Sequence, residues 1–569
     1  MPEVAVVAPT TGRLGDWFRG YASALMRRDL RLLLGGLMVS CTGSWAFNVG
    51  LFAFVFSRTH SLGWVGAAGA VRFLSALVFS PFGGVVAERM ERIRLMVGSD
   101  LACVVWQAGA AATAAAGGPV VVVVVLAALT TATNSVYPPA VAATIPSVVD
   151  EDDLVAANAL NGTIDNLVVI VGPAIGAALL LVGSPALVFA VNAASFAVSA
   201  AAVSRIRVRT KPVELAAGVS GVLRQMAAGV HTIVSLRAAR TLVGFSVLVS
   251  FVYGTDTVLF VAVSAHKLGT GARGFGYLLA GLGVGGIIMA AAVDRLARSS
   301  RLSLIILAGT AGYCLPTALL AIIHDPALAF AVQVVRGGAT LVVDVLAITA
   351  LQRTVPGDQI ARVFGIFFAF VLGAIALGAA VTPAVISALG LNGALYTMAL
   401  GPTALGLLGL PALLAIDRSA SAQAAALAPR VAVLGQLDIF AAASRPLLER
   451  LAGLEAEMKY PAGTAIVREG ETADALYVLV QGEVEVTARG ELGAERHIRT
   501  MSSPSYFGEI GVLEHIPRTA TVTALSDCRC ERIEGEGLLD ALTSAPASSS
   551  LMENVRSRLA LTHPSLAGR

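Results

Sequence analysis

Long apolar segments separated by short polar loops follow one another from residue 32 to residue 416. A helix needs about 20 apolar residues to cross a bilayer, and twelve segments reach that length. They cover residues 32–56, 63–86, 95–116, 119–142, 164–183, 185–204, 241–264, 274–293, 302–323, 326–350, 363–388 and 393–416. The pattern predicts an all-α membrane bundle of 12 transmembrane helices in two six-helix halves, the layout of a transporter with a site between its halves.

The pattern changes after residue 434, where short β-branched runs alternate with glycines. Residues 478–480 and 484–486 are such runs, and Gly463, Gly470 and Gly482 lie between the apolar segments. Runs of this length and composition are typical of strands joined by tight turns. We therefore expect a small C-terminal β-barrel domain with flanking helices.

These changes divide the chain into six predicted parts. They are a cytoplasmic N-terminal segment (1–31), a first six-helix half (32–204), a cytoplasmic central loop (205–240), a second six-helix half (241–416), a linker (417–433) and the barrel domain (434–560). The linker is short and alanine-rich, so we expect a stiff helical connection that can transmit motion.

The composition supports a membrane protein. Hydrophobic residues make up 56% of the chain and charged residues 14%, with a mean hydropathy of +0.78, whereas globular domains carry about 25% charged residues. The net charge of +3 gives no reason to expect a nucleic-acid partner. The five cysteines are scattered, so neither a disulfide framework nor a metal site is predicted.

Basic residues predict the orientation in the membrane. With the N-terminus in the cytoplasm, nearly all lysines and arginines of the loops fall on the cytoplasmic side, and only Arg58, Lys267 and Arg273 fall outside. An even number of spans then returns the C-terminus to the cytoplasm. The first apolar segment is too long and begins too late for a cleavable signal, so we expect a multi-pass protein of the cell membrane.

Residues 507–523, FGEIGVLEHIPRTATVT, carry the clearest chemistry. A cyclic phosphodiester needs backbone N–H donors and a guanidinium, and a ribose 2′-hydroxyl needs a carboxylate. The run resembles the phosphate-binding cassette of cyclic-nucleotide-binding domains, and the resemblance extends over residues 434–559. It implies a binding site for cAMP or cGMP formed by Gly508, Glu509, Ile510, Arg518, Thr519 and Ala520.

Within that resemblance each position has an implied role. Gly508 lets the backbone approach the ligand, Glu509 binds the ribose and Arg518 binds the phosphate, while Ala520 offers its backbone N–H. Thr519 is compatible with either purine. The family usually has a Gly-Asp turn before the cassette, where this chain has Ser503-Pro504-Ser505-Tyr506. A barrel that keeps the fold without binding a nucleotide is the alternative.

The loop after the second predicted span reads Gly84-Val-Val-Ala-Glu88-Arg89-Met-Glu-Arg92-Ile-Arg94. It resembles the loop motif of the major facilitator superfamily, in which a carboxylate and arginines form charge-assisted contacts as the halves move. Gly172-Pro173-Ala-Ile-Gly176 resembles the fifth span of drug and siderophore exporters of the transmembrane secretion effector type. The resemblance implies export; a packing kink without directional meaning is the alternative.

Ionisable side chains inside spans are costly and are candidates for function. They are Arg72, Asp100, Asp165, Asp256, Arg336 and Asp344. Asp100 is expected to pair with the loop arginines as a latch. Protonation of Asp256 or Asp344 is our hypothesis for coupling transport to protons; the alternative is that Arg336 and Asp344 neutralise charges on neighbouring helices. Gly281-Leu-Gly-Val-Gly-Gly286 formally matches a dinucleotide motif, but its place in a span predicts helix packing.

These features predict a secondary transporter, an exporter of a small amphipathic molecule, regulated by cytoplasmic cAMP or cGMP as ligand and not as a cofactor. Its partners would be the lipid bilayer, the nucleotide, the substrate and protons. The alternative is a membrane-anchored cyclic-nucleotide receptor without transport. No nucleophile motif or ATP-binding loop occurs, so no enzyme activity is expected. Cyclic-nucleotide modules often pair, which leaves a homodimer open.

Overall fold

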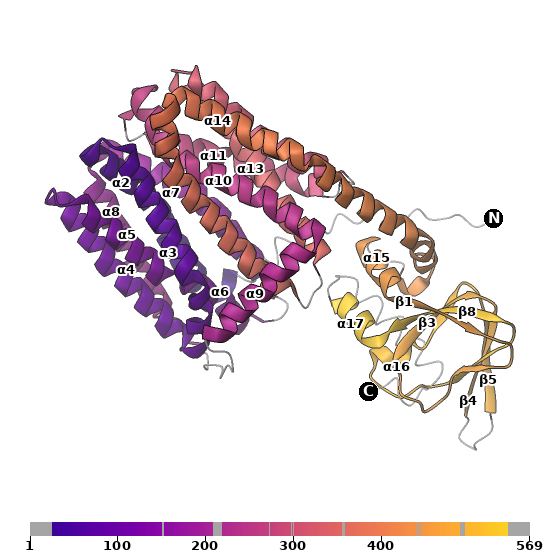
Figure 1. The fold of residues 1–569 in the computed structure, drawn as a ribbon. Helices are drawn as coiled ribbons and strands as arrows, with labels where there is room; N and C mark the ends of the chain where they lie inside the picture. Colours follow the sequence, from indigo (N-terminus) through magenta and orange to yellow (C-terminus); the bar gives the residue numbers. More distant parts are fainter. Residues whose placement is uncertain are drawn as a thin grey trace, which may run out of the picture. The chain divides into compact units, whose positions relative to one another are not determined.

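The computed structural model describes residues 25–150, 153–208, 219–271, 274–297, 299, 301–355, 359–440, 443, 445–489 and 495–543. The chain divides into two compact units, residues 1–417 and residues 418–569. Each unit has its own hydrophobic core. The predicted class, a helical membrane bundle followed by an antiparallel β domain, is confirmed (Figure 1).

The first unit is a bundle of long apolar helices that run side by side (Figure 1). Its first half contains α2 (Arg28–Thr59), α3 (Leu62–Arg89), α4 (Arg92–Ala115), α5 (Val120–Asn134), α6 (Tyr137–Val148), α7 (Leu154–Val182) and α8 (Pro185–Val203). Its second half contains α10 (Arg237–His266), α11 (Gly274–Ala297), α12 (Leu302–Cys314), η3 (Leu315–Ala321), α13 (Pro326–Thr354) and α14 (Ile360–Leu434). Helix α9 (Val219–Ser235) lies in the predicted central loop.

Eleven helices of the described residues are long and apolar enough to cross a membrane, where twelve spans were predicted. The difference arises at α14, which takes in both of the last two predicted spans and the predicted linker. Gly390 interrupts its helical geometry with φ 70° and ψ 170°. A straight helix of 75 residues would exceed 100 Å, at about 1.5 Å per residue, against a hydrocarbon layer of about 30 Å.

Two predicted spans are irregular. The fourth is split between α5 and α6, and prolines stand in the first turn of α6, where a missing N–H costs no helical hydrogen bond. The ninth continues from α12 into the 3-10 helix η3, which has a proline near its start. Both breaks lie inside segments that are apolar enough on average to be predicted as single spans, which is why the apolar pattern did not reveal them.

Small residues allow close helix contacts in the bundle. A Cβ at Gly172 of α7 would come within 2.3 Å of the Trp45 Cβ of α2, and one at Gly176 within 2.6 Å of the Ala46 carbonyl oxygen. In the predicted packing motif of α11, a Cβ at Gly285 would lie 1.8 Å from the Val334 carbonyl oxygen of α13. Gly281, Gly283 and Gly285 therefore serve helix packing, as predicted, whereas a Cβ at Gly286 would meet no atom within 4 Å.

The second unit contains two four-stranded antiparallel sheets. Their strand orders are β1-β8-β3-β6 and β2-β7-β4-β5. The strands are β1 (Glu455–Tyr460), β2 (Ala465–Val467), β3 (Ala475–Gln481), β4 (Glu483–Arg489), β5 (Glu495–Ser502), β6 (Ser505–Phe507), β7 (Thr521–Ala524) and β8 (Cys528–Glu534). Helices α15 (Arg445–Leu454), α16 (Glu509–Leu513) and α17 (Gly535–Thr543) flank them (Figure 1).

The turn that departs from the resembled family connects β5 to β6. Its Ser503 N–H donates to the Gly482 carbonyl at 3.3 Å. Strand β6 pairs with β3, so that Phe507 lies opposite Tyr477 in the register. The start of the cassette therefore pairs with the sheet although the turn before it differs from that of the family.

Candidate nucleotide and transport sites

Gly508 begins the cassette with a backbone that only glycine adopts easily. Its φ is 87°, and it precedes the short helix α16. A Cβ at this position would come within 2.5 Å of Arg518 Nη1. Glycine is thus required both by the left-handed backbone and by the close approach of the arginine.

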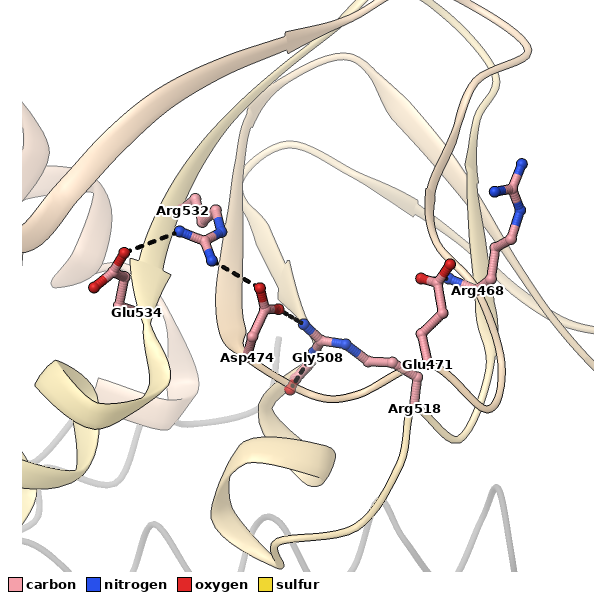
Figure 2. Close-up of polar contacts among 7 residues, drawn as sticks. All are labelled: Arg468, Glu471, Asp474, Gly508, Arg518, Arg532 and Glu534. Carbon is pink, nitrogen blue, oxygen red and sulfur yellow. Dashed lines mark hydrogen bonds and ion pairs between the residues drawn. The ribbon is translucent and has the colours of Figure 1, made fainter.

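Arg518 is buried and held at a fixed place. Its side chain is 3% exposed. Nη1 donates to the Gly508 carbonyl oxygen at 3.0 Å and Nη2 donates to Asp474 Oδ1 at 3.0 Å (Figure 2). The guanidinium carbon lies 5.7 Å from the centre of the Tyr477 ring, which stacks on Phe507. These contacts orient a fork of donors that suits a phosphate.

Asp474 joins Arg518 to a second arginine. Arg532 of β8 donates from Nη2 to Asp474 Oδ2 at 2.8 Å and also lies 3.4 Å from Glu534 Oε1 (Figure 2). Burial alone would raise the pKa of Asp474, but the hydrogen bond and charge of Arg532 and the charge of Arg518 lower that pKa below its usual value. Asp474 therefore carries a negative charge between the two guanidinium groups.

Neither Asp474 nor Arg532 was predicted from the sequence. Asp474 lies 44 residues before Arg518, outside the cassette. It reaches the site because β3, which follows it, pairs with β6, which leads into Gly508, and with β8, which carries Arg532. These strand pairings depend on the tertiary fold, and no local sequence motif indicates them.

A second loop is fixed to the cassette through its backbone. The Gly470 N–H donates to the Arg518 carbonyl and the Arg518 N–H donates to the Glu471 carbonyl, both at 2.8 Å. The Glu471 side chain accepts a hydrogen bond from the Arg468 N–H at 3.0 Å (Figure 2). The Gly470-Glu471 turn seen in the sequence thus braces the arginine.

The remaining cassette residues lie on either side of this centre. Glu509 and Ile510 are buried in α16. Thr519 and Ala520 are half-buried in the connection from Arg518 to β7. The structure therefore brings Gly508 and Arg518 into direct contact and places the other four beside them in the chain.

The first unit contains a buried ion pair between α10 and α13. Arg336 Nη2 donates to both carboxylate oxygens of Asp256, at 2.9 and 2.7 Å. Tyr313 of α12 donates its hydroxyl to Asp256 Oδ2 at 2.6 Å. Arg336 also donates to the Tyr313 carbonyl at 2.8 Å and to Gln333 Oε1 at 2.8 Å. The side chains of the pair are 0% and 3% exposed, so little solvent screens it.

This ion pair bears on the roles expected for Arg336 and Asp344. Arg336 neutralises Asp256 on a neighbouring helix, which was the alternative to a role in transport. Asp344, which was expected to share that role, is exposed and forms no hydrogen bond or ion pair with a described residue. Eight residues, about two turns of α13, separate it from Arg336, and the apolar pattern alone did not show which residues of this helix are buried.

The latch predicted for Asp100 is wrong. Asp100 is fully buried in α4, and neither carboxylate oxygen has a hydrogen-bond partner among the described residues. Arg92 instead donates to the Ala143 carbonyl at 2.7 Å, and Arg94 lies 3.4 Å from Glu91. Asp100 is two turns into the helix, which removes it from the loop arginines.

The other residues predicted for the transport part lie in α3 and α7. Gly84, Glu88 and Arg89 belong to α3, but their side chains lie outside the described residues. Gly172 packs against α2, and Pro173 lies where the two halves meet: a Cβ at Gly276 of α11 would be 3.1 Å from the Pro173 carbonyl oxygen. The exporter-like motif is thus part of the contact between the halves.

The fold and sites define a transporter-like multi-pass membrane protein with a cyclic-nucleotide-binding domain. The family model described as transmembrane secretion effector matches residues 22–436, and the chain belongs to this family of the major facilitator superfamily. The model described as cyclic nucleotide-binding domain matches residues 457–545.

Two curated relatives are each similar to a part of this chain. A cAMP-dependent protein kinase regulatory subunit of Yarrowia lipolytica is 39% identical over 92 residues, 16% of this chain and 23% of the relative. A CRP-like cAMP-activated global transcriptional regulator of Mycobacterium tuberculosis is 26% identical over 136 residues, 24% of this chain and 61% of the relative. The chain thus spans between about a quarter and three fifths of these relatives.

A solved structure titled cAMP bound PfPKA-R (141-441) is 26% identical, with a TM-score of 0.20. The match covers 21% of this chain and 43% of that one.

Proposed function

We propose that the chain is a secondary active exporter of a small amphipathic molecule, and that cytoplasmic cAMP or cGMP regulates it through the second unit. The observation that supports nucleotide binding is the buried guanidinium of Arg518, held against the Gly508 carbonyl with donors aimed at a shared counterion. The names of two relatives refer to cAMP.

The site chemistry suits a cyclic phosphodiester. The negatively charged phosphate oxygens would accept hydrogen bonds from Arg518. The side chain of Asp474, which is 57% exposed, can move away from Arg518 to make room for the phosphate. Glu509 would accept from the ribose 2′-hydroxyl, and the Ala520 N–H would donate to the phosphate. Nucleotide binding would replace the partly hydrated ion pair of Arg518 and Asp474 by a contact of Arg518 with the phosphate that is less exposed to solvent.

Calorimetry on the full-length protein in detergent tests this part, with cAMP, cGMP and the open-chain 5′-AMP as ligands. Hydrogen bonds to charged groups contribute about 1.5–3 kcal/mol each, so the loss of two such bonds to the phosphate in Arg518→Ala should weaken binding at least about a hundredfold. The exposed Arg445, which pairs with Glu449 at 3.0 Å, gives the control Arg445→Ala. No binding of either cyclic nucleotide to the unmodified protein would rule out the sensor.

The transport part is supported by the family and by the contact of Pro173 with Gly276 at the junction of the halves. We place the protein in the cell membrane with both termini in the cytoplasm, because the basic loops favour this orientation. Proteoliposomes loaded with a mixture of small aromatic anions, cations and neutral compounds would reveal export by mass spectrometry. Nucleotide binding without any flux would support the receptor alternative.

A further inference from the structure

A cavity of about 110 Å³ lies between the two halves of the first unit. The first half contributes α2 and α3 to its wall, and the second half contributes α10 and α11. Aromatic rings line much of it, among them Trp45, Phe52, Phe73 and Phe275. Such walls bind flat apolar groups through stacked and edge contacts.

Asp256 reaches this cavity, but its charge is already compensated. Both of its oxygens accept hydrogen bonds from Arg336, and one of them also accepts the Tyr313 hydroxyl. Arg336 and Tyr313 are themselves fully buried. The carboxylate is therefore a poor counterion for a cationic ligand.

Arg72 is the cavity residue whose charge lacks compensation. It lies on α3, within an apolar span, and forms no ion pair or hydrogen bond with a described residue. Its guanidinium carbon lies 5.5 Å from the centre of the neighbouring Phe73 ring. A cation kept at such a position without a protein carboxylate is expensive in a bilayer, and a ligand anion would relieve that cost.

Asn48 of α2 provides a second, independent indication of a ligand. It lines the cavity, is 5% exposed, and its Oδ1 atom has no hydrogen-bond partner among the described residues. A buried acceptor of this kind favours a ligand that carries a hydroxyl or N–H donor. The cavity thus offers an unpaired cation, an unpaired acceptor and aromatic walls.

From this combination we propose that the cavity binds an aromatic carboxylate that carries a hydrogen-bond donor. The acid group pairs with Arg72, the ring lies among the aromatic side chains, and the donor reaches Asn48. This assignment rests on the proposed transport function, and it names the class of substrate for that function. The ion pair of Asp256 and Arg336 forms the neutral floor of the site.

The test uses the full-length protein in lipid nanodiscs and radiolabelled 4-hydroxybenzoate in a scintillation proximity assay. Unlabelled 4-hydroxybenzamide and 4-hydroxybenzylamine have the same ring and hydroxyl but are neutral and cationic. We expect each to compete at least tenfold more weakly than unlabelled 4-hydroxybenzoate. Equal competition by either, or no binding of the carboxylate, would overturn the proposal.

Variants assign the two contacts. Arg72→Gln should weaken 4-hydroxybenzoate binding at least tenfold, while Arg72→Lys should retain part of it. Asn48→Leu should reduce the preference for 4-hydroxybenzoate over benzoate, which lacks the hydroxyl. Arg237→Gln, at an exposed position at the start of α10, is the matched control and should bind as the unmodified protein does. Unchanged binding by Arg72→Gln would refute the anion site.

A flux measurement separates this inference from the function on which it rests. Proteoliposomes that export neutral or cationic aromatics but not 4-hydroxybenzoate would overturn the anion site and leave the transporter in place. Absence of flux for every compound, together with intact carboxylate binding, would instead overturn transport and keep the binding site.

Discussion

At the scale of single residues, the contact of Gly508 with Arg518 joins backbone conformation to ligand chemistry. The left-handed backbone at Gly508 aims its carbonyl at the guanidinium, and the absence of a side chain leaves room for that group. The same residue thus shapes the turn and orients the charge. A change at this position should affect binding more than folding.

We predict that Gly508→Ala weakens cyclic-nucleotide binding by about tenfold or more, because the added methyl group strains a positive φ and displaces Arg518. Such backbone strain costs on the order of 1–3 kcal/mol. The control is Gly453→Ala in α15, where no atom lies within 4 Å of the added Cβ and φ is ordinary. Calorimetry on the full-length protein measures both; equal affinities of the two variants would show that the contact is not needed.

Residue identities were predictable where chemistry forms a local motif. Gly508, Glu509 and Arg518 stand within a dozen positions of one another, so a sequence pattern can reveal them. Asp474 was not predictable, because only the pairing of β3 with β6, which leads into Gly508, and the contacts of the 470–471 turn bring it to Arg518. Likewise Asp256 and Arg336 were recognised as costly charges in a span, but their mutual contact depends on helix rotation, which hydropathy does not specify.

At the scale of helices and strands, ion pairs attach the end of α14 to strands β1 and β8 of the second unit. Arg430 lies 3.7 Å from Glu455 of β1 and 3.6 Å from Glu531 of β8, and it donates to the Glu455 carbonyl at 3.1 Å. The Oε2 atoms of both glutamates are buried without a hydrogen-bond partner among the described residues. Arg430 is therefore the shared cationic partner of the Glu455 and Glu531 carboxylates.

This arrangement predicts a pH-dependent stability of the second unit. Burial, and then repulsion by Glu531, raise the pKa of Glu455 from 4.5 to about 8, although Arg430 lowers it. Burial also raises the pKa of Glu531, again against Arg430. Between pH 4.5 and about 8 the folded unit holds a proton that the unfolded chain releases, so the free energy of unfolding decreases as pH rises.

Hydrogen–deuterium exchange on the full-length protein, corrected for intrinsic rates, measures this effect at the amides of β1 and β8. Protection should decrease from pH 5 to pH 8, and the change in opening free energy should be on the order of a few kcal/mol. Glu455→Gln should flatten this dependence. Glu457→Gln, at a more exposed position of the same strand, should leave it intact. A slope that survives Glu455→Gln would assign the effect to another group.

The helices and strands were predictable where the surrounding lipid or water determines the pattern of apolar residues. Lipid requires about 20 apolar residues per crossing, so most spans can be read from hydropathy. The interruptions between α5 and α6 and between α12 and η3 were not predicted, because the segments that contain them are still apolar on average over the length of a span. The short strands of the second unit follow from β-branched runs and glycine turns, but the assignment of each strand to its sheet follows from long-range pairing.

At the scale of the whole molecule, the two halves of the first unit touch at defined points that can be cross-linked or separated. A Cβ at Gly69 of α3 would lie 3.3 Å from the Ala379 Cβ of α14, close to the separation of about 3.5–4.5 Å in disulfides. A disulfide between Gly69→Cys and Ala379→Cys would fix this contact. Gly69→Trp would wedge the same contact open. These variants bias the transport unit in opposite directions.

If nucleotide binding regulates transport, then the state of the transport unit must alter nucleotide affinity by the same factor. We therefore expect the cAMP affinity of the cross-linked and wedged proteins to differ about 5- to 150-fold, which corresponds to a coupling of about 1–3 kcal/mol. Gly312→Cys with Ala339→Cys is the control, because its sites are 3.1 Å apart within the second half. Equal affinities in the cross-linked, wedged and control proteins would mean that the second unit is tethered to the transporter without controlling it.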